Sequence, residues 1–398
     1  MSTMDRHRAW EGPALFSFGF RPFFLGAGIW ATVTMALWIA VLSGRLILPT
    51  RLHPVDWHAH EFLFGYLGAV MAGFLMTAVP NWTGRMPLVG RPLALLFALW
   101  LIGRAAVTVS VLLPPLAVPL ADLAFPLALL AAMGREVVAG RNWRNLVVLG
   151  MLGLFTLGNA AFHLDAMRGG APAQGAGLRL GLGAAILLVA LIGGRIIPSF
   201  TRNWLAKRGS GRLPTPPDRR FDKAALLALL AALLLWIGAP EAPLAGVGLI
   251  LAGGLHAVRL CRWAGDRCAA EPLVWVLHLA YAFVPLGALT LGGAILFPAS
   301  LSPAAAQHLW MAGGIGLMTL AVMTRATLGH TGQALTAGRG TTVLYLAVIL
   351  AVLARLGAGL VPGSADLLLA LSALGWIVGF GGFALLYGGL LWRPRRPR

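Results

Sequence analysis

Residues 272–297 read PLVWVLHLAYAFVPLGALTLGGAILF, a run that contains no Asp, Glu, Lys or Arg. As a helix, a run of this length crosses the hydrocarbon core of a bilayer, which is roughly 30 Å thick. Similar runs recur along all 398 residues, of which 59% are hydrophobic and 11% charged, and the mean hydropathy is +0.82. Water-soluble domains do not have this composition. The sequence therefore predicts an all-α membrane protein.

Twelve apolar runs have the length of a membrane-spanning helix. The first sixteen residues are charged and contain no short apolar core, which argues against a cleaved signal peptide. We therefore expect a cytoplasmic amino terminus and, after twelve crossings, a cytoplasmic carboxyl terminus. The twelve predicted spans are 19–43, 57–80, 92–111, 113–134, 144–166, 177–200, 223–239, 243–262, 272–297, 304–326, 341–361 and 368–391.

The net charge of +18 has two interpretations. Clustered Lys and Arg are typical of nucleic-acid binding. Here the basic residues fall mainly on alternate connections, such as 202–223 and the RPRRPR tail, as the positive-inside rule requires. The opposite connections carry few, namely Arg45, Arg51, Arg104, Arg168 and Arg179. The charge thus indicates topology and lipid contact, and we expect no nucleic-acid partner.

An internal repeat follows from aligning His60 on His308 without gaps. The alignment also pairs Gly65 with Gly313 and places Thr-Gly at the end of both segments. A third segment, GGRIIPSFTRNW, fits the same register, so the second, sixth and tenth spans correspond. The alternative is a transporter of two six-span halves divided at the polar connection 201–222, but it does not predict this register. We expect one polytopic domain, 1–398, with a pseudo-threefold arrangement of four-helix repeats at about 19–134, 144–262 and 272–391.

Histidines gather at the outer ends of several predicted spans. WHAHEFLFG, residues 57–65, holds His58 and His60 at the start of the second span, His308 starts the tenth, and His163 ends the fifth. Imidazole is the commonest biological metal ligand and suits iron, copper and zinc. His58 and His60 lie about 200° apart around a helix, so they serve two different sites. We interpret His53, in the preceding loop, as an interfacial residue.

Glycines follow both aligned histidines and would let a flat porphyrin approach the helices. We therefore predict a haem iron held between His60 and His308, with Asp56 orienting the His60 ring. Helix packing is the alternative explanation of these glycines. At the inner ends, Arg195 and Arg325 could bind haem propionates or another anion, or extend to lipid phosphates. His278 is a candidate second ligand from the inner side.

Four motifs, WHAHEFLFG, AVPNWTGR, GGRIIPSFTRNWL and HLWMAGGIGLMTLAVMTRATLGHTG, resemble the signatures of the NnrS family over essentially the whole chain. The resemblance implies a haem- and copper-containing protein of the bacterial inner membrane that is linked to nitric oxide and denitrification. The predicted twelve spans, arranged as three four-helix repeats with histidines on the second and tenth, also resemble the catalytic subunit of haem-copper oxidases and nitric oxide reductases. The chain departs from them because the sixth and seventh spans contain no histidine. A second metal would then use His58 and His163, or His278.

The leading hypothesis is a haem b protein, with one or two haems and copper as a further candidate, that binds nitric oxide and reduces or otherwise removes it. His60 and His308 would hold one iron, His58 and His163 a second haem or metal, and Glu61 would deliver protons as a catalytic group. No C-x-x-C-H motif occurs, so haem would be non-covalent and electrons would come from quinol or a separate donor. The alternatives are a transporter, a haem or metal carrier, and a non-catalytic nitric oxide sensor or tolerance protein.

Overall fold

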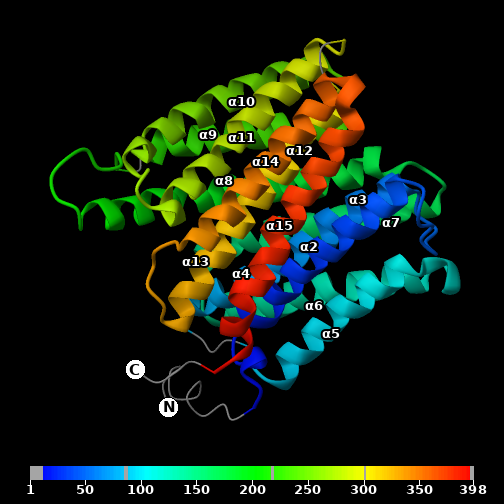
Figure 1. Ribbon diagram of the computed structural model, residues 1–398, viewed down its shortest axis with the longest axis horizontal. Helices are drawn as coiled ribbons and strands as arrows, with labels where there is room; N and C mark the ends of the chain where they lie inside the picture. Colours follow the sequence, from blue (N-terminus) through cyan, green and yellow to red (C-terminus); the bar gives the residue numbers. More distant parts are fainter. Residues whose placement is uncertain (1–11, 85–87, 217–218, 300–301, 395–398) are drawn as a thin grey trace. The chain divides into compact units, whose positions relative to one another are not determined.

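The computed structural model describes residues 12–84, 88–216, 219–299 and 302–394 (Figure 1). Within these residues there are twelve helices long and apolar enough to cross a membrane, and no β-strand, so the predicted fold class and span count are confirmed. Most span ends agree with the prediction to within a few residues. The charged amino-terminal segment and the end of the RPRRPR tail, on which the predicted orientation rests, lie outside the described residues.

Ten of the twelve spans are single helices, and two are interrupted. The single helices are α2 (Phe20–Leu42), α5 (Arg91–Thr108), α6 (Ala117–Ala139), α7 (Leu146–Met167), α8 (Ala176–Leu205), α9 (Arg219–Gly238), α10 (Pro243–Cys261), α11 (Pro272–Leu296), α14 (Arg339–Leu360) and α15 (Ala365–Trp392). The second span joins α3 (Pro54–His60), η2 (Glu61–Tyr66) and α4 (Leu67–Thr83). The tenth joins α12 (Pro303–His308), η7 (Leu309–Leu317) and α13 (Met318–Thr331).

The two interrupted spans share one local structure. In each, an α-helix that begins with proline ends at the aligned histidine, and a π-helix follows directly. A π-helix bonds each residue to the fifth one along and is frequent at functional sites. The same backbone feature after His60 and after His308 supports the alignment of these segments. The third aligned segment lies in α8, which is α-helical throughout.

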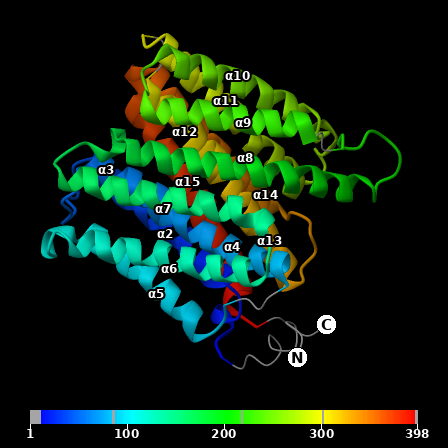
Figure 2. The ribbon, with the colours of Figure 1, turned by 180° about the vertical axis from the view of Figure 1, so that it is seen from behind.

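Contacts within the chain divide it into two compact units. Unit 1 is residues 1–181, 326–333 and 380–398, and unit 2 is residues 182–325 and 334–379. In unit 1, α6 packs against both α5 and α7, and α2 packs against α4 (Figure 2). In unit 2, α9, α10 and α11 lie side by side, and η7 packs against α11 and α14 (Figure 1). The predicted single domain and its threefold repeat stay predictions.

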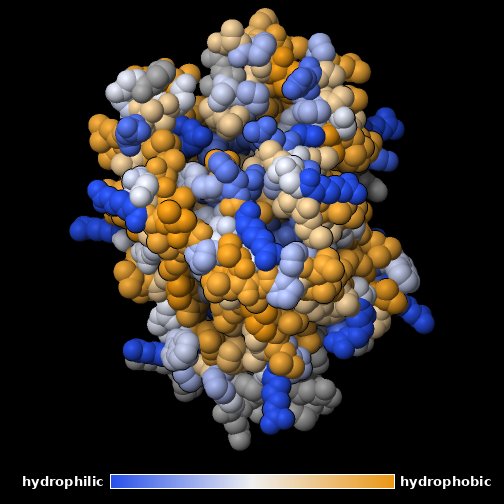
Figure 3. Space-filling view, turned by 90° about the vertical axis from the view of Figure 1, so that its right-hand side faces the viewer, coloured by the Kyte–Doolittle hydropathy of each residue, from blue (hydrophilic) through white to orange (hydrophobic). Residues whose placement is uncertain are grey.

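Large apolar side chains cover much of the outer surface, as Figure 3 shows for one face. Leu95, Leu120 and Leu385, for example, are 68%, 71% and 85% exposed. Extended apolar surfaces are rare on soluble monomers and are what lipid chains cover in a membrane. The chain is therefore a multi-pass membrane protein.

Candidate metal centre

Unit 1 buries five ionisable side chains against one another. His60 and Glu61 are 0% exposed, Asp122 1%, Arg104 3% and His163 5%. They come from four separate spans: α3 with η2, then α5, α6 and α7. Ionisable groups at membrane depth are costly unless they pair or line a site. Such a cluster is a functional candidate for that reason.

Arg104 connects the two acids of the cluster. Its Nη1 donates to Glu61 Oε1 at 2.7 Å, and its Nη2 donates to Asp122 Oδ1. Two glycines allow this approach: a Cβ on Gly65 would collide with the guanidinium, and a Cβ on Gly103 would lie 3.0 Å from Asp122 Oδ1 and 3.1 Å from its Cα. The glycine after His60 therefore makes room for an arginine of a neighbouring helix.

Glu61 holds the His60 ring from one side. Its Oε1 lies 3.1 Å from His60 Nδ1, and its Oε2 accepts from Trp30 Nε1 at 2.9 Å. A carboxylate on one ring nitrogen fixes the orientation of the ring and directs the other nitrogen, as in many metal sites. Asp56, which was predicted for this role, instead accepts from the backbone N–H of Ala173 at 2.9 Å.

The second nitrogen of His60 faces two oxygens. Nε2 lies 3.0 Å from Asn159 Oδ1 and 3.2 Å from Asp122 Oδ2, while Asn159 Nδ2 donates to the same Asp122 oxygen at 2.7 Å. An imidazole has two nitrogens, and here both face acceptors. Three arrangements satisfy these contacts: His60 carries both protons, one of the two facing acids is protonated, or the proton lies on Nδ1 and a metal ion lies at Nε2.

His163 completes a set of three ligand atoms. Its Nε2 is 2.9 Å from Asp122 Oδ2, and its ring centroid is 5.0 Å from that of His60. One ligand atom each from His60, Asp122 and His163 all lie within 4.8 Å of one another. Ligands bound at about 2.0–2.2 Å to one tetrahedral ion are spaced about 3.4 Å apart. The arrangement therefore fits a metal ion with small side-chain adjustments.

The charges of the cluster favour a bound cation. Two carboxylates, Glu61 and Asp122, outweigh the single guanidinium of Arg104 by one negative charge when both histidines are neutral. One proton on an imidazole or a carboxylate, or a monovalent metal ion, restores the balance, and a divalent ion leaves one positive charge; balance matters because burial makes an uncompensated charge expensive. The rival of a metal centre is thus a purely structural ion cluster that carries one extra proton on a histidine or an acid.

His58 lies on the other side of its helix from this cluster. It is half-buried, its ring stacks on that of Trp38 at 4.3 Å, and it is 4.7 Å from the ring of Phe62. The structure brings His163 to His60 and places His58 against α2, in agreement with the opposed directions predicted for the H-x-H pair. His53 is exposed at the start of α3.

The residues beside His60 do not fit a haem bound through this histidine. Arg104 fills the space beside Gly65, and the Phe64 and Phe162 rings have their centroids 5.5 Å and 5.2 Å from that of the His60 ring, so these side chains occupy the place of a flat porphyrin. In unit 2, the glycines after His308 are also covered, because Phe283 occupies the space at Gly313 and a Cβ on Gly316 would lie 2.7 Å from Trp376. At Gly65, Gly313 and Gly316 neighbouring side chains occupy the space beside the backbone, which supports the alternative interpretation, helix packing, at these three positions.

His308 has a different environment from His60. It is half-buried, and its Nδ1 donates to Ala304 O at 2.7 Å within its own helix. That bond places the proton on Nδ1 and the lone pair on Nε2, which is the tautomer that a metal-binding histidine uses. A haem on His308 stays a prediction.

The three residues discussed for the predicted inner side, His278, Arg195 and Arg325, lie in unit 2. His278 is 8% exposed, and its Nε2 is 2.8 Å from Thr201 Oγ1. Arg325 lies over the Phe200 ring at 4.0 Å from its centroid, and Arg195 is exposed on α8. A cation over an aromatic face is stabilised without any anion. The predicted anion site at these arginines and the ligand role of His278 stay predictions.

Two members of the cluster, Arg104 and Asp122, and their hydrogen-bond partner Asn159 were not predicted as site residues. Asp122 is the only acid in its apolar run, and an ionisable residue inside a span is a functional candidate by default. Asn159 precedes His163 by four residues and so shares its helix face. Arg104 was assigned to an outer connection, which is wrong: it is buried in α5 and paired with two acids.

Residues 14–395 match the family model described as NnrS protein. The resemblance drawn from the four motifs is confirmed by this match over nearly the whole chain. No curated protein sequence gives a significant match.

Proposed function

Because the chain belongs to the NnrS family, we propose that it is a metalloprotein of the nitric oxide response, in which His60, Asp122 and His163 hold one transition-metal ion. One observation carries the proposal: three ligand atoms from three separate spans converge within 4.8 Å in a buried cluster with a surplus negative charge. The family membership supports the role in the nitric oxide response and a location in a bacterial membrane.

The donor set favours a particular group of metals. Two imidazoles and one carboxylate suit iron, copper and zinc, and leave coordination positions open. Of these, ferrous iron or copper at this position would supply a redox-active site to which nitric oxide binds. Calcium and magnesium prefer all-oxygen sites, so they fit poorly.

The surrounding residues have defined roles in this proposal. Glu61 orients His60 through Nδ1, and Asn159 fixes the direction of Asp122 by donating to its Oδ2. Arg104 pairs with both acids and compensates one of their two negative charges. Residues that hold metal ligands in this way commonly change metal affinity 10- to 100-fold, by order of magnitude, when they are mutated.

Nitric oxide reduction with quinol or a separate electron donor, and haem b bound through His308, extend the same proposal. Reduction consumes protons, and Glu61 and the two histidines of the cluster are the groups that could exchange them near the metal. A sensor that binds nitric oxide without turnover would use the same ligands. A turnover assay with a chemical electron donor separates these two functions.

The test uses the protein purified in detergent and has two readouts. Mass spectrometry measures the metal content, and electron paramagnetic resonance records the spectrum after addition of nitric oxide. We expect one non-haem metal ion per chain and a nitrosyl signal. His163→Ala should lose both, whereas His58→Ala, on the other side of the second span, should keep both.

Metal-free wild-type protein, or a His163→Ala variant with full metal content, would leave the structural ion cluster as the explanation. Substrate flux in proteoliposomes without any spectral change on nitric oxide addition would favour the transporter alternative.

A further inference from the structure

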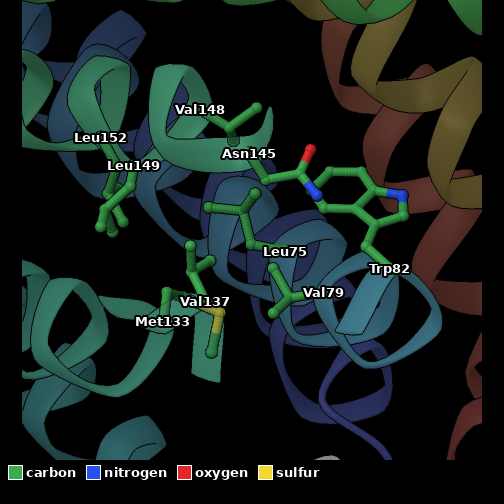
Figure 4. Close-up of a pocket in the computed structure, with 9 residues that line it drawn as sticks. All are labelled: Leu75, Val79, Trp82, Met133, Val137, Asn145, Val148, Leu149 and Leu152. Carbon is green, nitrogen blue, oxygen red and sulfur yellow. The ribbon is translucent and has the colours of Figure 1, made fainter. Parts of the chain in front are cut away.

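Two small, partly open cavities lie along helices α4, α6 and α7 of unit 1. The first is lined by Leu75 and Val79 of α4, Met133 and Val137 of α6, and Val148 and Leu152 of α7 (Figure 4). The second is lined by apolar side chains, among them Phe125, Leu129, Leu152 and Phe155, and at its polar end by Arg104, Asp122 and Asn159. Each has a volume of about 10 Å³, close to the minimum that accepts one water-sized molecule.

The two cavities follow each other along the helices. Leu152 belongs to the wall of both. On α6, the lining residues recur about once per turn from Val137 through Met133 and Leu129 toward the ligand Asp122. Since each residue adds 1.5 Å, this stretch covers roughly 22 Å of helix. The two cavities therefore lead from the carboxyl-terminal end of α6 to the candidate metal centre.

The cavity walls select the kind of molecule that fits. Leu129, Met133, Leu152 and Phe155 are 1–3% exposed and present no hydrogen-bonding group. A water molecule needs two to four polar partners, whereas apolar cavities stay dry and accept xenon. A volume of this size excludes organic substrates and quinols. The chemistry points to a small uncharged gas.

The far end of the first cavity differs from its middle. In Figure 4 the Trp82 indole and the Asn145 amide lie on one side of the cavity, and Leu149 and Leu152 lie on the other. Trp82 is half-buried at the last turn of α4, and Asn145 precedes α7. Polar groups thus stand at the two ends of the row, and apolar side chains line everything between them.

We propose that these two cavities are successive positions on a path by which a diatomic gas reaches the Asp122 side of the cluster. Naming the gas as nitric oxide rests on the proposed function. Leu152 is the dividing side chain: it is 2% exposed and stands between the two positions. Its movement sets the rate of passage.

The first experiment measures nitric oxide binding kinetics by stopped flow for Leu152→Trp, with Leu157→Trp as the matched control. Leu157 is on the same helix but is 56% exposed, so its indole would lie outside the packed interior. For Leu152→Trp we expect association and dissociation rates that both fall about tenfold, with the ratio of the two and the metal content unchanged. Leu157→Trp should match the wild type.

Unchanged rates in a folded, metal-loaded Leu152→Trp variant would overturn the path. A loss of affinity without slower association would overturn it as well, because a path alters the two rates equally. Leu152→Phe is the milder variant should the indole prevent folding, and it should slow both rates in the same direction.

The second experiment uses xenon and needs no metal. Xenon-129 magnetic resonance of the detergent-solubilised chain should show binding in the wild type and Leu157→Trp, and its loss in Leu152→Trp. If xenon binds in this pattern but no nitric oxide adduct forms, the path stands and the proposed function fails. If nitric oxide binds the metal but its binding rates in Leu152→Trp equal those of the wild type, the path fails and the proposed function stands.

Discussion

The segments that follow His60 and His308 have the same backbone and different chemistry. In both, the histidine ends an α-helix and a π-helix begins at the next residue. His60 is 0% exposed with both nitrogens bonded to side chains of the cluster, whereas His308 is half-buried and bonds to a carbonyl of its own helix. The backbone feature alone therefore does not make a metal site.

The difference comes from what packs against each segment. Glu61 follows His60, but Leu309 follows His308. At the aligned glycines, Arg104 fills the space at Gly65, while the Phe283 ring fills the space at Gly313. Unit 1 thus surrounds its π-helix with acids, an arginine and a second histidine, and unit 2 surrounds its π-helix with apolar rings. The site in unit 1 depends on α5, α6 and α7, which supply these partners.

The largest effect is expected from Asp122→Ala. This change removes the shared acid, leaves Arg104 with one partner and takes away a ligand. Breaking a buried ion pair from one side typically costs about 3–5 kcal/mol, so we expect a strongly lowered unfolding midpoint in detergent and no bound metal. The exposed Asp366, at the start of α15, provides the control, since Asp366→Ala should change neither the unfolding midpoint nor the metal content. Full metal content in Asp122→Ala would refute the ligand assignment.

The aligned glycines give the next test. Gly65→Ala places a methyl group against Arg104 and Glu61, and Gly313→Ala places one against the Phe283 ring. Overpacking should lower the free energy of unfolding by roughly 1–3 kcal/mol in both variants. Only Gly65→Ala should also weaken metal binding, because only there is the neighbour part of the cluster. Competition with a chelator of known affinity measures the metal affinity of each variant. Equal metal loss in both variants would show that the two segments do not differ in their effect on metal binding.

The sequence could show the twelve spans because lipid leaves a helix no alternative to a long apolar run. It could also show that His58 and His60 face opposite sides, because that follows from helix geometry. The partners of His60 could not be derived in the same way. Arg104 stands near the end of an apolar run, so its sequence position alone suggested that it lies in a connection between two spans. Only the packing of the helices shows that it reaches two acids.

Gly65 shows a second limit of the sequence. A glycine five residues after a histidine on the same span marks a place where a neighbouring group can approach the backbone closely, but it does not identify that group. A porphyrin was expected, and the structure has a guanidinium there. The π-helices were also not predicted, because the extra residue in the turn is stabilised by packing from other helices and leaves no simple periodic pattern.

A smaller effect is expected from Glu61→Gln. The amide keeps the shape of the side chain and can still accept from His60 Nδ1, but it no longer compensates the charge of Arg104. We expect metal to remain bound with about tenfold lower affinity, as is usual for a residue that orients a ligand. Leu309→Met, at the aligned position in unit 2, is a volume-conserving control and should leave metal affinity unchanged. A Glu61→Gln variant with wild-type affinity would reduce Glu61 to a packing role.

The smallest effect on the metal centre is expected from His308→Ala. The lost side chain is half-buried and bonds to its own helix, and alanine favours helix, so the free energy of unfolding should change by no more than about 1 kcal/mol. Non-haem metal content and the nitrosyl signal should equal those of the wild type, because no ligand of the cluster is touched. Pyridine-haem content gives the second readout: if the wild type carries haem b, this variant is the one expected to lose it. Loss of the non-haem metal in the His308→Ala variant would show that the two aligned histidines serve one site. The conclusion that only the segment after His60 contributes to the metal centre would then be wrong.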